Sequence, residues 1–172
     1  ADAARLMARY HQISVPTESN HLIQEAQPLT LTYQRCLRMM DIYLNFDLAD
    51  PDFRTYLIEV RDWADHARHQ EAYYQQDPWN CIINTEVNNT NWIIDRQAGT
   101  LHLVDWEKPL WGDPSQDLSH FRVPTTTLWK TNYRMSERDR IQMMSTYQDA
   151  LSDPHLRDTI EERTRLRDPF NC

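Results

Sequence analysis

Apolar residues in the first half of the chain recur at the three- and four-residue spacing of helices. This spacing predicts a helix over residues 1–12, a short helical stretch around 19–27, and a helix over 29–45. Asp50 then supplies an N-cap, followed by a first-turn proline, for a helix over 51–76. We expect this last helix to bury its apolar side chains, namely Phe53, Tyr56, Leu57, Val60, Trp63 and Ala64.

The middle of the chain changes to the pattern of short strands. Residues 81–83 form a β-type run. The segments 92–95 and 100–104 flank a four-residue loop, which is a hairpin signal, and Gly99 suits the positive-φ position of that loop. We therefore expect one β-hairpin in a chain that otherwise favours helices.

The last third returns to helical spacing. It predicts a short helix near 114–121, an irregular stretch over 123–131, and two longer helices near 136–151 and 154–167. The fold class that follows is α+β, mostly helical, with a single small hairpin.

Composition and charge exclude several classes of protein. The 172 residues are 40% hydrophobic and 26% charged, which is ordinary for one globular domain. No run approaches the roughly 18 apolar residues of a membrane span, and the net charge of −8 argues against non-specific nucleic-acid binding. Three cysteines without CxxC spacing argue against a disulfide framework or a zinc site. We expect a cytoplasmic protein with neither a membrane nor a nucleic-acid partner.

The scarcity of glycine and lysine limits the nucleotide chemistry that this chain could perform alone. Its only glycines are Gly99 and Gly112, and its only lysines are Lys108 and Lys130. A Walker-type phosphate loop and a GxGxxG dinucleotide fingerprint each need several closely spaced glycines. Neither motif is present in this sequence.

The predicted hairpin brings oxygen-bearing side chains to its open end. If Asp95 pairs with Thr100, then Asn91 and Asp105 meet there, and Glu86 lies on the loop that feeds the first strand. An amide oxygen and two carboxylates suit Mg²⁺, which shares its coordination shell with water and phosphates. Phosphoryl transfer needs such a metal and a carboxylate to orient the attacking hydroxyl. The alternative is a polar hairpin end, rich in asparagine for its turn chemistry.

Three segments in this region resemble motifs of one family. Residues 84–94 (NTEVNNTNWII) resemble the catalytic loop HGDxxxxNxxx of the aminoglycoside phosphotransferase and choline kinase family. Residues 103–107 (LVDWE) resemble its metal-binding motif, and residues 112–118 (GDPSQDL) resemble its GDPxxDL segment. They follow in the family's order. The helix ending in residues 8–11 (ARYH) also resembles the helix that opens the family's C-terminal lobe.

This resemblance implies a kinase-like fold and a role for each matching position. Asn91 and Asp105 would bind Mg²⁺ and, through it, ATP. Glu86 falls where the family has its catalytic Asp, and Asn84 where it has His. Asp117 would support the loop by accepting its backbone hydrogen bonds. The implied reaction is ATP- and Mg²⁺-dependent phosphorylation of a hydroxyl on a small molecule, such as an aminoglycoside, choline, a sugar or an amino alcohol.

The chain departs from the family's pattern in two ways. Asn84 and Glu86 replace the family's His and Asp, and a displacement near 1 Å can cost about a hundredfold in rate. The family's N-terminal lobe, which covers ATP, is missing. We expect residues 1–172 to be a C-terminal lobe, a fragment inactive without that partner. The alternatives are a kinase-like binding module without transfer activity and a structural helical domain with accidental motif matches.

Other residues have weaker claims to function. In the family, the region after GDPxxDL leads to substrate-binding helices, so Trp129 and Tyr133 would line the acceptor pocket, with core or interface packing as the alternative. Trp106 is expected to pack beneath the metal loop. His66 and His69 lie three apart on a helix, but with no third ligand evident we expect a solvated face.

Overall fold

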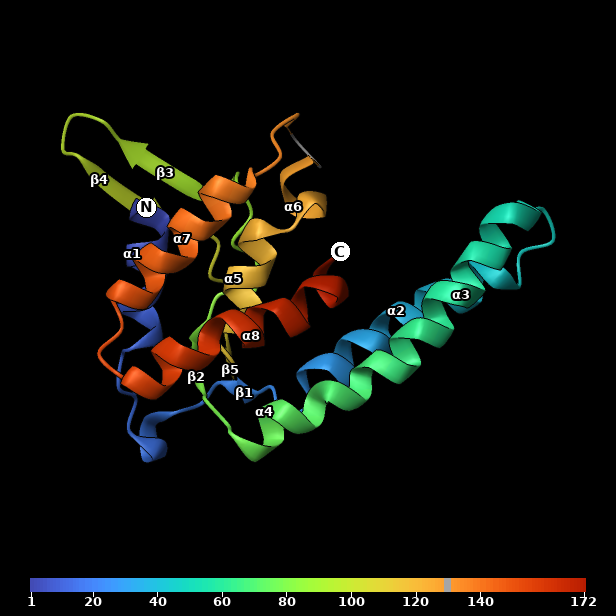
Figure 1. Cartoon of the computed structure of the whole chain (residues 1–172), viewed down its shortest axis with the longest axis horizontal. Coiled ribbons are helices and arrows are strands. Elements are labelled where there is room, and N and C mark those ends of the chain that lie inside the picture. Colours follow the sequence, from blue (N-terminus) through green and yellow to red (C-terminus); the bar gives the residue numbers. More distant parts are fainter. Residues whose placement is uncertain (129–130) are drawn as a thin grey trace. The chain divides into compact units, whose positions relative to one another are not determined.

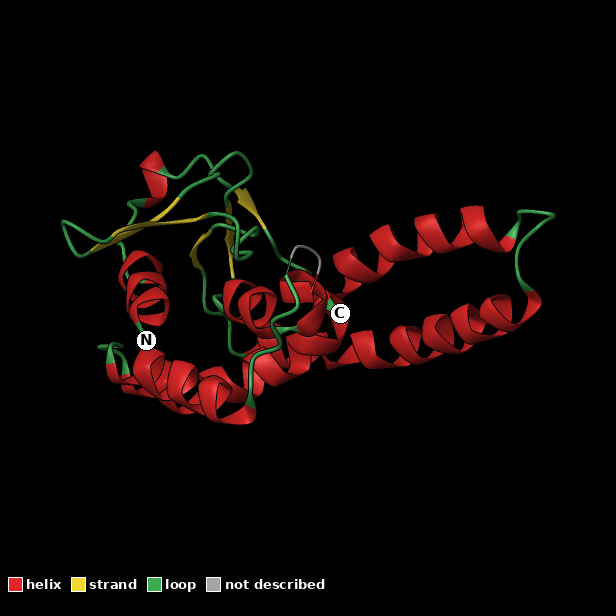
Figure 2. Cartoon of the chain, turned by 90° about the horizontal axis from the view of Figure 1, so that it is seen from above, coloured by secondary structure: helices red, strands yellow, loops and turns green. Residues whose placement is uncertain are grey.

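A computed structural model of the chain describes residues 1–128 and 131–172. These residues divide into two compact units, one formed by Ala1–Glu25 with Pro78–Cys172 and the other by Ala26–Asp77. The chain is mostly helical with two small sheets, as the α+β prediction requires (Figures 1 and 2). Within the described residues, no helix has the length and apolar character to cross a membrane.

The first unit combines short strands with helices of different lengths. Its helices are α1 (Asp2–His11), the 3-10 turn η1 (Thr17–Ser19), α5 (Ser115–Arg122), α6 (Pro124–Leu128), α7 (Glu137–Asp149) and α8 (Pro154–Asn171). The predicted helices over 1–12, 114–121, 136–151 and 154–167 are thereby confirmed, with ends that move by a few residues. The stretch 123–131, predicted to be irregular, contains α6 in its described part.

The hairpin of the first unit has the predicted register. Strands β3 (Trp92–Asp95) and β4 (Thr100–Leu103) pair antiparallel with Asp95 opposite Thr100. The Val104 amide continues the ladder by donating to the Asn91 carbonyl over 2.9 Å. Gly99 takes the expected left-handed conformation, with φ of 66°.

A three-stranded sheet was only partly predicted. It has the order β1-β5-β2, from β1 (Ile23–Gln24), β2 (Cys81–Ile83) and β5 (Leu110–Gly112). Only β2 was expected as a strand. The prediction of helix around 19–27 is wrong, because the backbone there pairs parallel to β5, a partner far along the chain. Two- and three-residue strands are too short for a period of two to reveal them.

The core of the first unit lies where α1, α5, α7 and α8 meet. Its buried members are Ala4, Met7, Ala8, Tyr10, Leu118, Met143, Met144, Tyr147, Leu151, Leu156 and Ile160. Partly buried Trp92 and Leu103 of the hairpin pack against this cluster. The hairpin is therefore anchored to the core by one of its faces, and its open end has a fixed place.

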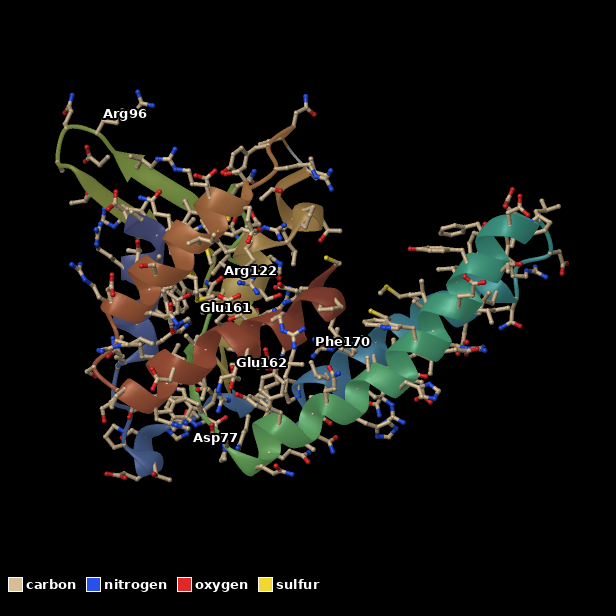
Figure 3. The ribbon with its side chains drawn as sticks, in the orientation of Figure 1. Asp77, Arg96, Arg122, Glu161, Glu162 and Phe170 are labelled. Atoms are coloured by element: carbon tan, nitrogen blue, oxygen red, sulfur yellow. The ribbon has the colours of Figure 1, made fainter. Side chains whose placement is uncertain are left out.

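Buried arginines join α8 to the rest of the first unit. Arg163 donates to the Asp113 carboxylate over 2.6 Å, and Arg167 donates to Glu25 over 2.8 Å. Arg122 on α5 lies beside Glu161 on α8 (Figure 3), with 3.1 Å between Nη1 and Oε1. Removing one partner of such a pair leaves a buried charge and costs about 3–5 kcal/mol.

The second unit is a helical hairpin followed by a short return. It contains α2 (Pro28–Leu44), α3 (Pro51–Ala67), the 3-10 turn η2 (Arg68–Glu71) and α4 (Ala72–Gln76). Asp50 is the N-cap of α3 as predicted, since its carboxylate accepts from the amides of Asp52 and Phe53. The predicted single helix over 51–76 is interrupted by η2.

The expectation that this helix buries its apolar side chains is wrong. None of the residues of α3 is buried, and Phe53, Tyr56 and Trp63 are about half exposed. Within this unit, α2 is the one long helix that packs against α3. Each of the two helices can therefore cover only one stripe of the other. The remaining apolar side chains point outside that stripe.

Candidate functional site

The buried carboxylate of Asp117 holds the loop of the candidate site through hydrogen bonds. Asp117 lies in the first turn of α5 and is fully buried. Its two carboxylate oxygens accept from the backbone amides of Asn84 and Thr85 over 2.7 and 2.8 Å. The Tyr10 hydroxyl donates to the same carboxylate over 2.6 Å. The loop that follows β2 is therefore fastened at its first two residues to α5 and α1.

His11 completes the surroundings of this carboxylate. Its Nε2 lies 3.3 Å from Asp117 Oδ2, and its Nδ1 forms a 2.8 Å hydrogen bond with the Tyr147 hydroxyl. Burial by itself would raise the pKa of Asp117, but the hydrogen bond and charge of His11, with the Tyr10 hydroxyl and the Asn84 amide, lower it overall. Burial, and then the charge of Asp117, raise the pKa of Tyr10. Asp117 is thus held ionised away from solvent, where it can position the loop but not touch a substrate.

The fastened loop turns sharply and meets the end of the hairpin. Thr85 has φ of 73° and Asp105 has φ of 64°, a conformation that costs a non-glycine residue about 1–2 kcal/mol. The Asn84 side chain links both turns, because its Nδ2 donates to the Asp105 carbonyl over 3.1 Å and its Oδ1 accepts from the Glu86 amide over 3.0 Å. Strain held by buried contacts is a frequent property of functional loops.

Asn91 and Asp105 lie together at the open end of the hairpin. Asn91 Nδ2 is 3.5 Å from Asp105 Oδ2 and donates to the Glu86 carbonyl over 2.8 Å. Because Nδ2 is engaged by that carbonyl, Oδ1 is the atom of this amide left to act as a metal ligand. Its described contact is a long one, 3.4 Å from the Thr90 hydroxyl.

Three carboxylates gather around this point. Glu86, Asp105 and Glu107 each offer an oxygen within 4.8 Å of the others. Lys108 balances part of their charge, with Nζ 2.7 Å from Glu107 and 3.5 Å from Glu86. Carboxylate and amide oxygens are the donors that Mg²⁺ takes at about 2.0–2.1 Å. The donor set therefore fits a hard divalent cation, and Glu107 is a member that sequence reasoning did not assign.

Of the three other residues expected near the site, the structure describes Trp106 and Tyr133. Trp106 is partly exposed, donates from its indole to the Leu103 carbonyl over 3.0 Å, and meets Tyr10 edge-on. Trp129 lies outside the described residues. Tyr133 is half exposed, and its amide donates to the Thr131 hydroxyl. That same hydroxyl accepts from Asn89 over 3.3 Å. The segment holding Tyr133 therefore touches the loop that carries Glu86, although Tyr133 itself has no described contact with the carboxylates.

His120 is the residue that sequence reasoning missed beside this loop. It lies one helical turn after Asp117, and its Nδ1 is buried without a hydrogen-bond partner among the described residues. Burial lowers its pKa, while the charges of Asp117 and Glu86 oppose that shift. The three-residue spacing from Asp117 was visible in the sequence, since it places both side chains on one helix face. His66 and His69, by contrast, are exposed as expected.

No family model matches this chain, and no curated protein matches it either. The assignment of a function therefore depends on the chemistry of the groups just described.

Proposed function

We propose that this chain is the metal-binding lobe of a kinase-like phosphotransferase that uses ATP and Mg²⁺ to phosphorylate a hydroxyl of a small molecule. The observation that carries the proposal is the double hydrogen bond from the backbone of Asn84 and Thr85 to the buried Asp117. It positions the next residue, Glu86, beside Asn91 and Asp105. A polar hairpin end that served only as a turn would not need a buried carboxylate to hold a second loop against it.

Each group at this site has a separate role in the proposed phosphoryl transfer. Asn91 and Asp105 are the proposed ligands, and a Mg²⁺ ion held by them would neutralise charge on the ATP phosphates. Glu86 would accept a hydrogen bond from the attacking hydroxyl and orient it toward the phosphate. Asp117 and Asn84 keep the two loops in register, which matters because transfer depends on positioning.

The partners follow from the same chemistry. Cationic acceptors such as aminoglycosides, choline or amino alcohols suit the carboxylates of Glu86 and Glu107, and a sugar remains compatible with Glu86 alone. We propose that the nucleotide is covered by an N-terminal lobe that this chain lacks, and that the protein works in the cytoplasm.

The second candidate function is a kinase-like module that binds nucleotide without transferring phosphate. One observation favours it. The Glu86 carboxylate lies 3.5 Å from Lys108, and a carboxylate oxygen engaged by a cation is less available to accept a hydrogen bond from an attacking hydroxyl. Both functions share the metal ligands, so they differ only in what Glu86 does.

Two measurements test the proposal. In the first, Mn²⁺ with a non-hydrolysable ATP analogue is titrated into the chain, with binding followed by the paramagnetic signal of Mn²⁺. We expect Asp105→Ala to weaken metal-dependent binding at least tenfold, and Glu162→Gln, an exposed carboxylate paired with Arg165, to leave it unchanged. Equal binding by wild type and Asp105→Ala would remove the metal site.

In the second measurement, the chain together with the proposed N-terminal lobe is assayed for ATP consumption against a panel of aminoglycosides and small alcohols. Loss of turnover in both Glu86→Gln and Asp105→Ala would identify a transferase. We expect at least a hundredfold loss for Glu86→Gln, in the range that general-base groups contribute. Metal-dependent ATP binding without turnover on any acceptor would instead favour the binding module.

A further inference from the structure

The hairpin of α2 and α3 exposes large apolar side chains from both helices. On α2, Met39 and Tyr43 are four residues apart. On α3, Tyr56 follows Phe53 by three residues and precedes Trp63 by seven. Each set therefore lies on one face of its helix. The two sets meet, because the Tyr43 and Phe53 rings are 5.1 Å apart and the Phe53 and Tyr56 rings are 6.1 Å apart. We call these five residues the aromatic face.

Four of the five residues of the aromatic face are about half exposed or more. Met39 is 65% exposed, Tyr56 56%, and Phe53 and Trp63 46% each. Two further apolar residues adjoin it, Ile42 in α2 and Phe46 in the turn, and both are exposed by more than half. Contiguous apolar patches beyond a few hundred Å² mark interaction sites on most soluble proteins.

The size of this surface suits a specific interface. Large apolar side chains bury about 150–250 Å² each, so a half-exposed one leaves on the order of 100 Å² for a partner. Four to six such residues give roughly 400–600 Å². A specific protein–protein interface of ordinary size buries about 800 Å² per partner, and flanking polar residues supply the remainder.

The charges beside the aromatic face are of opposite sign on the two helices. Arg35 and Arg38 lie along the outer edge of α2, whereas Glu59 lies along the outer edge of α3. Within the described part of the chain, none of these three has an ion-pair partner. The charges also match in their positions along the helix axis. The antiparallel pairing that places Tyr43 against Phe53 also places Arg38 beside Glu59 along that axis.

We propose that the aromatic face is a homodimer interface, in which two α2–α3 hairpins pack face to face as a four-helix bundle. A two-fold axis parallel to the helices lays α2 of one copy over α3 of the other. This rotation keeps the position of every residue along the helix axis. The basic edge of each copy therefore meets the acidic edge of its partner. Two-fold pairing through one self-complementary surface is the commonest symmetry of oligomers, and four-helix bundles bury the stripes that two helices leave open. This proposal is independent of the phosphotransferase proposal.

The experiment is sedimentation equilibrium of the chain over micromolar concentrations. We expect a species of twice the 20.6 kDa chain mass. Tyr56→Glu places a charge in the centre of the face and should weaken dimerisation by at least ~30-fold, the effect of losing one strong interface residue. Ile58→Glu is the matched control, because Ile58 is also exposed, at 38%, but faces the opposite side of α3. Circular dichroism of both variants checks that the helices persist.

A charge exchange tests the arrangement of the helices. Arg38→Glu and Glu59→Arg should each weaken the dimer about threefold to tenfold, and the two changes together should restore it, because attraction between the two edges is regained. A monomer at every concentration, or equal dissociation by Tyr56→Glu and Ile58→Glu, would overturn the proposal. So would a monomer whose aromatic face is occupied by a different protein.

Discussion

At the scale of single residues, Asp117 is the group on which the site depends most. Its carboxylate joins α1, α5 and the loop before Glu86, and its charge is compensated by His11, Tyr10 and two backbone amides. In contrast, the carboxylates of Asp105 and Glu107 face outward. One buried acid therefore fixes geometry, while the exposed acids are accessible from solvent.

Asp117→Asn is expected to destabilise the first unit by about 3 kcal/mol, because the amide cannot accept from all four donors and leaves His11 poorly paired. Since the folded-state pKa of Asp117 is lowered, its contribution to stability is present above the unfolded value of about 3.9 and is lost as pH falls through the folded pKa. Urea unfolding from pH 7 down to pH 3 measures both effects.

The control for this variant is Asp2→Asn, which removes an exposed carboxylate paired only with Arg5. It should change stability by less than about 0.5 kcal/mol. If Asp117→Asn unfolds at the same urea concentration as wild type at pH 7, the loop is not held by this carboxylate and the account of the site fails.

At the scale of elements, the two long helices of the second unit, α2 and α3, are each capped by an acid from outside the helix. Asp50 caps α3 directly, and Glu71 accepts from the amides of Leu29 and Thr30 at the start of α2, which lie 42 and 41 residues before it in the chain. These contacts satisfy amides that have no partner inside the helix. With little buried apolar surface, the hairpin relies on its caps more than a core helix does.

Asp50→Ala should therefore destabilise α3 by about 1 kcal/mol, the usual effect of removing an N-cap, while Asp50→Asn retains an acceptor and most of the stability. Hydrogen exchange of α3 amides measures this locally, and a loss of that size corresponds to exchange about fivefold faster. Equal exchange in both variants would mean that the cap contributes nothing and that α2 alone holds α3.

Some elements of the fold could be predicted from the sequence and others could not. The longer helices and the β3–β4 hairpin were predictable because their signals lie within a few residues, as with Asp50 before Pro51 and Gly99 in its loop. The pairing of β1 with β5 was not, since no local pattern joins residues so far apart. Likewise Asp117 was expected to hold the loop, but its contact with His11 spans 106 residues and only folding reveals it.

At the scale of the whole molecule, the division into two units separates the two proposals. Every residue of the candidate metal site belongs to the first unit, and every residue of the aromatic face belongs to the second. A ligand that binds only the folded site stabilises what it touches by RT ln(1 + [L]/Kd), about 2.7 kcal/mol at a hundred times Kd. The effect of metal and the effect of dimerisation should therefore appear in different segments of the chain.

Hydrogen exchange in the presence of Mg²⁺ and an ATP analogue tests this separation. We expect slower exchange over residues 84–91 and 103–107, where Asn91 and Asp105 would bind, and unchanged exchange over α2 and α3 at constant protein concentration. Raising the protein concentration should slow exchange in α2 and α3 and leave the two loops unchanged. Asp105→Ala should abolish only the first effect and Tyr56→Glu only the second. Protection that spreads equally over both units, or that survives in Asp105→Ala, would show that the cation acts elsewhere than at the hairpin end.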